Sequence, residues 1–216
     1  MFINRQDAGE QLARALDRYR GQNPLVLAIP RGGVEIGYQV ATHLDADFSI
    51  LISCKLPFPD NPEAGFGAIA EDGTTFIFPS HAAHLPPYLV DDIVQEQKAE
   101  IERRVEVLRG GQPLPPIAGR TVILVDDGIA MGSTMRASIA MLKNQAAARI
   151  AVAVPVTSER VKREIAATVD DVAVLATPPY FRAVAQVYRN WYDVSDSEVL
   201  AIMDRWRQER RTSPER

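Results

Sequence analysis

Five short apolar runs, separated by longer amphipathic stretches, constrain the fold of this chain more than any other feature. The runs occupy residues 25–29, 48–53, 122–125, 150–154 and 172–175. Apolar runs of this length are typical of strands buried on both faces of a parallel sheet. The amphipathic stretches predict helices over residues 7–20, 34–44, 134–144 and 159–168. This alternation predicts an α/β fold, a doubly wound, mainly parallel five-stranded sheet with helices on both faces.

Size and charge narrow the classes of protein that the chain can belong to. With 216 residues it can bury a substantial core, and we expect one domain over residues 1–216. A formal charge of −4 disfavours a protein that binds nucleic acid through many phosphates. No apolar run approaches the roughly 18 residues of a membrane span, and the first residues lack a signal-peptide pattern. We therefore expect a cytoplasmic protein with no membrane partner.

One interval breaks the alternation of strands and helices. Lys55 and Tyr88 are 33 positions apart, whereas loops between strands and helices usually have about 2 to 6 residues. Prolines early in the interval oppose a helix, and two β-prone runs flank Asp72 and Gly73. We predict an insertion over about residues 56–87 that begins as a mobile loop and continues as a hairpin with an Asp-Gly turn.

The remaining segments complete the predicted architecture. A helix over residues 89–108 carries a narrow apolar stripe, which favours packing against the body of the protein or against a second subunit in a homodimer. Gly110 and Gly111 end this helix. After the fifth apolar run, aromatic residues precede a last helix from about Asp196, with Ser195 as its N-cap.

The sharpest functional signal lies at the end of the third apolar run. Two adjacent carboxylates, Asp126 and Asp127, are followed by a turn of small residues that opens a helix near Thr134. Acids are costly to desolvate, so a pair at the carboxyl end of a strand should face a crevice and bind hydroxyls or a cation. Backbone N–H groups that converge at a helix N-terminus favour a phosphate. The acid pair and the converging N–H groups together predict a site for a ribose 5-phosphate group.

This stretch resembles the binding motif for 5-phosphoribosyl-1-pyrophosphate (PRPP) in the type I phosphoribosyltransferases. The resemblance covers nearly the whole chain and is to a poorly characterised bacterial branch of that family. A bacterial receiver domain, a rival interpretation of the acid pair, carries its acids after the first strand rather than the third. The resemblance implies that Asp126 and Asp127 hold the ribose hydroxyls. It implies a 5-phosphate site formed by Gly128, Ile129, Ala130, Met131, Gly132, Ser133 and Thr134.

Two other strand ends follow the order of binding loops in the family. Arg31, Gly32 and Gly33 follow the first apolar run and resemble the loop that holds pyrophosphate, for which a planar guanidinium is suited. Lys55 ends the second run, and the resemblance implies that it also contacts pyrophosphate. The insertion after Lys55 would then close as a lid over the reaction centre.

The resemblance has further implications for chemistry and geometry. Arg31 and Lys55 would act with the two acids as the catalytic residues, and Mg²⁺ would be carried by PRPP near Asp126 and Asp127 without direct protein ligands. The strand order should be 2-1-3-4-5, so that the loops at Arg31 and Asp126 are adjacent. The peptide bond between Pro30 and Arg31 is expected to be cis when ligand is bound.

Two positions depart from the family pattern and concern the substrates. Met131 stands where many members have Thr, which implies weaker PRPP binding, and Ala130 stands where hypoxanthine and guanine salvage enzymes have an acid. The acceptor site is expected in a C-terminal hood over about residues 177–209. Its candidate stacking side chains are Phe181, Trp191 and Tyr192.

These observations lead to one functional prediction and one alternative. The prediction is an enzyme that transfers the 5-phosphoribosyl group between PRPP and a nitrogenous acceptor, such as a nucleobase, with Mg²⁺ and release of pyrophosphate. The alternative is a regulatory protein that senses PRPP without catalysis. Cys54, the only cysteine, fits a small buried side chain better than a nucleophile, and the sequence assigns no chemistry to the three histidines.

Overall fold

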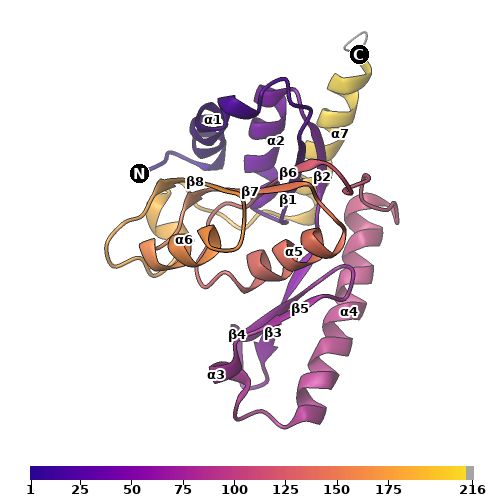
Figure 1. Ribbon diagram of the computed structural model, residues 1–216, viewed down its shortest axis with the longest axis vertical. Coiled ribbons are helices and arrows are strands. Elements are labelled where there is room, and N and C mark those ends of the chain that lie inside the picture. The colour runs from indigo at the N-terminus through magenta and orange to yellow at the C-terminus, as the bar shows by residue number, and fades with distance from the viewer. Residues whose placement is uncertain (213–216) are drawn as a thin grey trace.

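A computed structural model describes residues 1–212, and its centre is a five-stranded parallel sheet (Figure 1). The strands are β1 (Leu25–Ala28), β2 (Asp47–Ile50), β6 (Thr121–Val125), β7 (Arg149–Val156) and β8 (Asp171–Ala176). They lie in the order β2-β1-β6-β7-β8, and every neighbouring pair is parallel. This is the predicted order 2-1-3-4-5, which is therefore confirmed, as is the α/β class.

Helices cover both faces of this sheet (Figure 1). One face carries α1 (Arg5–Ala15), α2 (Gly33–Leu44) and α7 (Asp196–Thr212), and the other carries α5 (Ser133–Asn144) and α6 (Glu159–Ala166). Apolar side chains of each helix layer pack against one face of the sheet and form two separate buried clusters. The helix predicted over residues 7–20 is divided in the structure, because α1 ends at Ala15 and a short 3-10 helix, η1, spans Asp17–Tyr19.

The insertion folds as a second sheet rather than as a loop followed by a hairpin. It has three antiparallel strands, β3 (Ser53–Phe58), β4 (Asn61–Ala70) and β5 (Thr75–Ile77). The predicted strand over residues 48–53 was wrong in extent, because β2 ends at Ile50 and β3 begins a different sheet at Ser53. The Asp-Gly turn is confirmed: Gly73 has φ +88°, and the Asp72 carboxylate accepts from the N–H of Thr74 at 2.8 Å.

The prolines explain why the start of the insertion was misjudged. They exclude a helix, but an antiparallel pair tolerates proline where the pairing is irregular. The register of β3 and β4 shifts on both sides of Pro57. Residues 53–58 therefore pair with β4, although the sequence pattern predicted a loop from residue 56 onward.

The small sheet lies between two helices. One of its faces packs on α4 (Pro87–Arg109), which buries Ile93, Ile101 and Leu108, and the other packs on α5. A single-turn helix, α3 (Pro79–Ala82), connects β5 to α4. The predicted helix over residues 89–108 and its packing against the body are confirmed, and it ends at Gly110, which has φ +61°. No helix of residues 1–212 is long and apolar enough to span a membrane.

The chain after β8 returns over the carboxyl ends of the strands. The hood predicted over residues 177–209 includes most of α7. We use the term hood segment for residues 177–195, which precede α7 and contain a 3-10 helix, η2 (Val184–Val187). The N-terminus pairs with it, because the N–H of Phe2 donates to the carbonyl of Val187 at 2.8 Å. The predicted N-cap of α7 is confirmed: Ser195 Oγ accepts from the N–H of Glu198, whose carboxylate accepts from the N–H of Ser195.

Candidate active site

The two central strands bring the predicted binding loops together. Ala28 of β1 lies beside Val125 of β6, and the N–H of Ile29 donates to the carbonyl of Val125 at 2.9 Å. The loop at Arg31 and the acids at 126 and 127 therefore leave the sheet side by side, at the switch point of the strand order. The peptide bond between Pro30 and Arg31 is cis, the geometry that the sequence resemblance implied for the ligand-bound protein.

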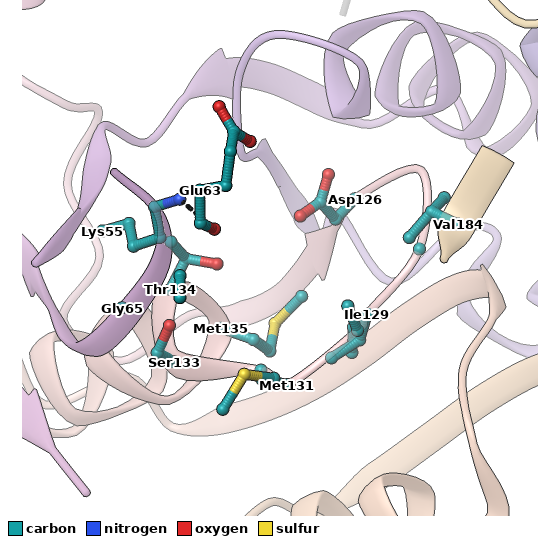
Figure 2. Close-up of a pocket in the computed structure, with 14 residues that line it drawn as sticks. Lys55, Glu63, Gly65, Asp126, Ile129, Met131, Ser133, Thr134, Met135 and Val184 are labelled. Atoms are coloured by element: carbon teal, nitrogen blue, oxygen red, sulfur yellow. Dashed lines mark hydrogen bonds between the residues drawn. The ribbon is translucent and has the colours of Figure 1, made fainter. Parts of the chain in front are cut away.

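Three adjoining cavities meet at Asp126. The loop cavity, about 280 Å³, is lined by residues 128–135 together with Lys55, residues 63–65 and Val184 (Figure 2). The hood cavity, about 370 Å³, includes Arg31, Gly32 and Trp191. The strand cavity, about 360 Å³, includes Ser53, Cys54 and Lys55. Asp126 lines all three, so its carboxylate is the central polar group of the site.

The wall of the loop cavity is the turn that precedes α5. The N–H of Ile129 donates to the carbonyl of Val156, the last residue of β7, and the Oγ1 of Thr157, the next residue, donates to the carbonyl of Ile129. The start of the turn is therefore fixed to the carboxyl end of β7. Gly132 has φ +81° and leads directly into the helix. Among residues 1–212, no group accepts a hydrogen bond from the N–H groups of residues 131–134. These donors at a helix N-terminus are suited to a phosphate.

The two acids have different surroundings. Asp126 Oδ1 accepts from the N–H of Asp127 at 2.8 Å, and burial together with the charge of Asp127 raises the pKa of Asp126 well above its ordinary value. Burial also raises the pKa of Asp127, but Arg5 opposes that rise. Asp127 is thus held in an ion pair, whereas the side chain of Asp126 faces the cavities without a basic partner among the described residues.

Arg5 is the partner of Asp127, and the sequence analysis did not identify it. Its Nε donates to Asp127 Oδ2 at 2.8 Å, its Nη1 donates to the carbonyl of Tyr192 at 2.9 Å, and its side chain is only 3% exposed. The guanidinium carbon lies 4.0 Å from the ring centre of Trp191. Arg5 therefore connects the second acid of the motif to the hood segment.

Gly32 makes this ion pair possible. A Cβ at this position would lie 1.9 Å from Asp127 Oδ2 and 2.8 Å from Arg5 Nε. The backbone of Gly32 has φ −59°, which any residue adopts, so the requirement for glycine is one of space. The close approach of the loop after β1 to Asp127 thus depends on the missing side chain.

Two tyrosines extend the polar network on the hood side. Tyr188 Oη donates to the backbone carbonyl of Asp127 at 2.7 Å, and Tyr192 Oη donates to Glu35 Oε1 at 2.9 Å. Burial raises the pKa of Glu35, and burial together with Glu35 raises the pKa of Tyr192 to about 12. Burial also raises the pKa of Tyr188, so both tyrosines are neutral donors near pH 7.

Three cations surround the opening at Asp126. Arg31 is 43% exposed and has Asp196 at 3.8 Å, and Lys55 Nζ donates to the carbonyl of Glu63 at 2.7 Å (Figure 2). The third, Arg104 of α4, lines both the hood and the strand cavities. Sequence reasoning missed Arg104 because it is one charged residue of a highly charged helix and belongs to no motif.

The predicted acceptor side chains are not gathered in one place. Trp191 lines the hood cavity, but the Arg5 guanidinium lies over its ring, and Phe181 and Tyr192 are not among the residues that line the three cavities. Val184 of η2 lines both the loop and the hood cavities (Figure 2). It lies over Gly128, where a Cβ would be 2.6 Å from Val184 Cγ1.

The remaining residues with possible chemistry do not add a second centre. Burial raises the pKa of the Cys54 thiol, which keeps it protonated near pH 7. Within residues 1–212, no three His, Cys, Asp or Glu side chains cluster as a ligand set for a metal ion. The site instead combines one carboxylate, Asp126, with cations and free N–H groups. This combination fits a ligand that carries its own phosphate oxygens.

Comparisons with known proteins agree with this geometry. The model of the family described as "Phosphoribosyl transferase domain" matches residues 4–187. Two Mycobacterium tuberculosis proteins whose names give them as candidate phosphoribosyl transferases, MT0597 of strain CDC 1551 / Oshkosh and Rv0571c of strain ATCC 25618 / H37Rv, are 39% identical over 207 residues. The alignment covers 95% of this chain, and the chain spans about half the length, 47%, of these relatives.

A solved structure extends the comparison to three dimensions. The protein TT1426 from Thermus thermophilus is 32% identical, with a TM-score of 0.80. The superposition covers 95% of this chain and 99% of that chain. The similarity therefore includes the insertion and the hood segment as well as the central sheet.

Proposed function

The chain belongs to the phosphoribosyl transferase family, and on this premise we propose that it transfers the 5-phosphoribosyl group between PRPP and a nitrogenous acceptor ring. In this reaction the bond between C1 of the ribose and a pyrophosphate oxygen breaks, and the oxygen keeps the electron pair. A ring nitrogen of the acceptor forms the new bond to C1 and releases its proton to solvent. Released pyrophosphate is the second product.

One observation carries this proposal: free N–H donors, a carboxylate and three cations surround the same point at the switch of the sheet. PRPP has groups that match each of them, namely a 5-phosphate, ribose hydroxyls and a pyrophosphate. Their order around Asp126 follows from the topology, because the loop at residues 126–132 leaves β6, Arg31 follows β1, and Lys55 lies in β3, which begins shortly after β2. A site for a phosphate alone would not need the carboxylate.

The loop cavity would hold the 5-phosphate and the ribose. The N–H groups of residues 131–134 and the hydroxyls of Ser133 and Thr134 would bind the phosphate oxygens. Asp126 and Asp127 would accept from the ribose hydroxyls, Asp127 with the oxygen that Arg5 leaves free. Met131, 44% exposed, contributes its N–H but no hydroxyl.

Arg31, Lys55 and the N–H groups of Gly32 and Gly33 would hold pyrophosphate. As the C1–O bond breaks, negative charge develops on the leaving group, and cations fixed beforehand at that place stabilise the transition state. Positive charge develops on the ribose ring at the same time, close to the carboxylate of Asp126. These two electrostatic effects are the main contribution of the chain to the rate.

Mg²⁺ fits the donor set of this site. It prefers oxygen ligands and is commonly bound through one or two carboxylates together with substrate phosphates. Asp126 presents one carboxylate to all three cavities, so Mg²⁺ would be held by PRPP oxygens and water next to it. When bound, the ion would neutralise charge on pyrophosphate.

The acceptor would enter on the side of the hood segment. Val184 supplies an apolar contact at the boundary between the loop and hood cavities, which is where a ring near C1 of the ribose would lie. Ala130 offers no acid to a purine ring proton, so the proposal does not include 6-oxopurines among the favoured acceptors. Trp191, Phe181 and Tyr192 stay candidates for stacking with the acceptor.

Calorimetry with PRPP and Mg²⁺, followed by pyrophosphate release with a panel of ring acceptors, tests the proposal. Asp126→Asn should weaken PRPP binding by about 10- to 100-fold, because a charged hydrogen bond at a desolvated site is lost. Asp92→Asn, which changes an exposed acid of α4, is the control and should bind normally. Absence of PRPP binding by the natural chain would overturn the proposal, and tight binding without turnover on any acceptor would identify a PRPP sensor instead.

A further inference from the structure

Arg104 is a cation of the site that comes from outside the motif loops. It lies on α4, the helix that supports the small sheet, and it is half-buried. Among residues 1–212, only Arg104, Pro30 and Asp126 line both the hood cavity and the strand cavity. Arg104 therefore stands between the cavity that contains Arg31 and the cavity that contains Lys55.

One end of the Arg104 guanidinium is fixed and the other is available. Its Nε donates to Glu100 Oε1 at 2.7 Å, one turn earlier on the helix. Within residues 1–212 its two terminal nitrogens donate no hydrogen bond. A guanidinium held at Nε presents its terminal N–H groups as a planar fork, which matches the oxygens of a phosphate.

The neighbouring Arg103 behaves differently although it shares the same acid. Its Nε and Nη2 donate to the two carboxylate oxygens of Glu100 at 2.7 and 2.8 Å, and it is 52% exposed. Arg103 does not line any of the three cavities. Glu100 is thus shared by two arginines, and it accepts from Arg103 through both of its oxygens but from Arg104 through only one.

Not every cation around the shared opening is held by a protein carboxylate. Lys55 has no carboxylate within 4 Å among the described residues, and the nearest acid to Arg31 is Asp196 at 3.8 Å. Asp127 is already paired with Arg5. Lys55, the terminal N–H groups of Arg104 and the loosely paired Arg31 are therefore available at this opening to the oxygens of an anion.

We infer that Arg104 is a further ligand of the pyrophosphate group, placed between Arg31 and Lys55, and that α4 is thereby part of the substrate site. The inference rests on the proposed function. Pyrophosphate has two linked phosphate groups, so it can be bound by the loop after β1 and by β3 at the same time. Arg104 would contact it where these two sets of contacts meet.

Titration calorimetry with three ligands tests this inference. The ligands are PRPP with Mg²⁺, pyrophosphate with Mg²⁺, and ribose 5-phosphate, and the variants are Arg104→Gln, Arg104→Lys and, as a matched control, Arg103→Gln. Arg104→Gln should weaken PRPP and pyrophosphate by about 10- to 100-fold, the effect of losing hydrogen bonds to a charged group. Binding of ribose 5-phosphate should change by less than about twofold, since that ligand lacks the pyrophosphate.

The remaining variants separate charge and geometry from folding. Arg104→Lys should lie between the natural chain and Arg104→Gln, because it keeps the charge but not the fork. Arg103→Gln should bind all three ligands as the natural chain does, and its melting curve provides the matched folding control. The inference is overturned if Arg104→Gln binds PRPP and pyrophosphate normally, or if it loses ribose 5-phosphate to the same degree.

The three ligands also distinguish this inference from the proposed function. If the natural chain binds pyrophosphate but not PRPP, and Arg104→Gln loses pyrophosphate, the proposed transfer fails while the role of Arg104 stands. If the natural chain binds PRPP and Arg104→Gln binds it equally well, the role of Arg104 fails while the proposed transfer stands.

Discussion

Replacement of Gly32 by alanine should disrupt the Arg5–Asp127 ion pair without straining the backbone. The new Cβ would lie 1.9 Å from Asp127 Oδ2, about 1.1 Å inside the 3.0 Å that such carbons respect. The carboxylate must therefore move by about that distance, which breaks its 2.8 Å hydrogen bond with Arg5 Nε. Because the φ of Gly32 is −59°, the backbone itself accepts alanine.

The size of the effect follows from the burial of the two charges. Breaking a buried ion pair costs about 3–5 kcal/mol, and the lower end applies here because Asp127 is 14% exposed and can reach water. Alanine also lowers the entropy of the unfolded chain, which stabilises the protein by about 0.4–1 kcal/mol. The net loss should be about 2–2.5 kcal/mol, or a fall in Tm of about 4–10 °C for a chain of this size.

Equilibrium unfolding in urea and thermal melting by circular dichroism measure this loss. The control is the same substitution in an Arg5→Met, Asp127→Ala background, where neither the carboxylate nor the guanidinium is present. There Gly32→Ala should be neutral or slightly stabilising. An equal loss in both backgrounds would show that the backbone, and not the ion pair, requires glycine; no loss in the natural chain would refute the steric argument altogether.

Four further measurements address other parts of the molecule. Glu71→Gln should destabilise the protein by about 3 kcal/mol in urea unfolding, because the buried Arg109 guanidinium, which now donates to both Glu71 oxygens, loses its counter-ion; an unchanged midpoint would show that this pair is dispensable. Arg103 and Arg104 lower the pKa of Glu100 to about 2, so the stability advantage of the natural chain over Glu100→Gln should be constant above pH 4.5 and decline as the pH falls toward 2. An advantage that persists unchanged to pH 2 in melting curves would contradict this ion pairing. Met131→Thr should tighten PRPP and ribose 5-phosphate by about 2- to 10-fold in calorimetry, since it adds a hydroxyl at an exposed position of the phosphate loop, whereas equal affinities would mean that a hydroxyl at position 131 does not contact the phosphate. Hydrogen exchange over residues 59–65, which form the turn between β3 and β4 and the first part of β4, should slow when PRPP, Mg²⁺ and a nonreactive acceptor bind if this segment is a lid, and equal strong protection in both states would make it scaffold.

The sequence was sufficient for those features that depend on local pattern. Runs such as 122–125 and 150–154 are apolar throughout because both faces of a central parallel strand are covered, so the strands could be recognised without any contact information. The position of Asp126 at the end of β6 and of Arg31 after β1 then followed, because the carboxyl ends of neighbouring parallel strands share one edge. The N-cap at Ser195 and the turn at Gly73 were likewise determined by residues only a few positions apart.

The sequence was less informative where a segment changes partner. The run over residues 48–53 contains residues of two sheets. Its side chains are apolar on both sides of the point where the chain leaves one sheet for the other, so the sequence pattern does not indicate that point. Prolines in the insertion were correctly interpreted as incompatible with a helix. Their tolerance at an irregular point of an antiparallel pair depends on the partner strand, which a local pattern does not contain.

Only the tertiary structure decided which distant side chains complete the site. Arg5 lies 122 positions from Asp127, and Arg104 and Val184 come from a helix and a hood segment whose local patterns indicate packing alone. A single charged residue on an amphipathic helix has the same local signature whether it faces water or a buried acid. Its role is set by the docking of α1, α4 and the hood segment around the strand ends, because ion pairing and cavity lining depend on distances between atoms and not on separation along the chain.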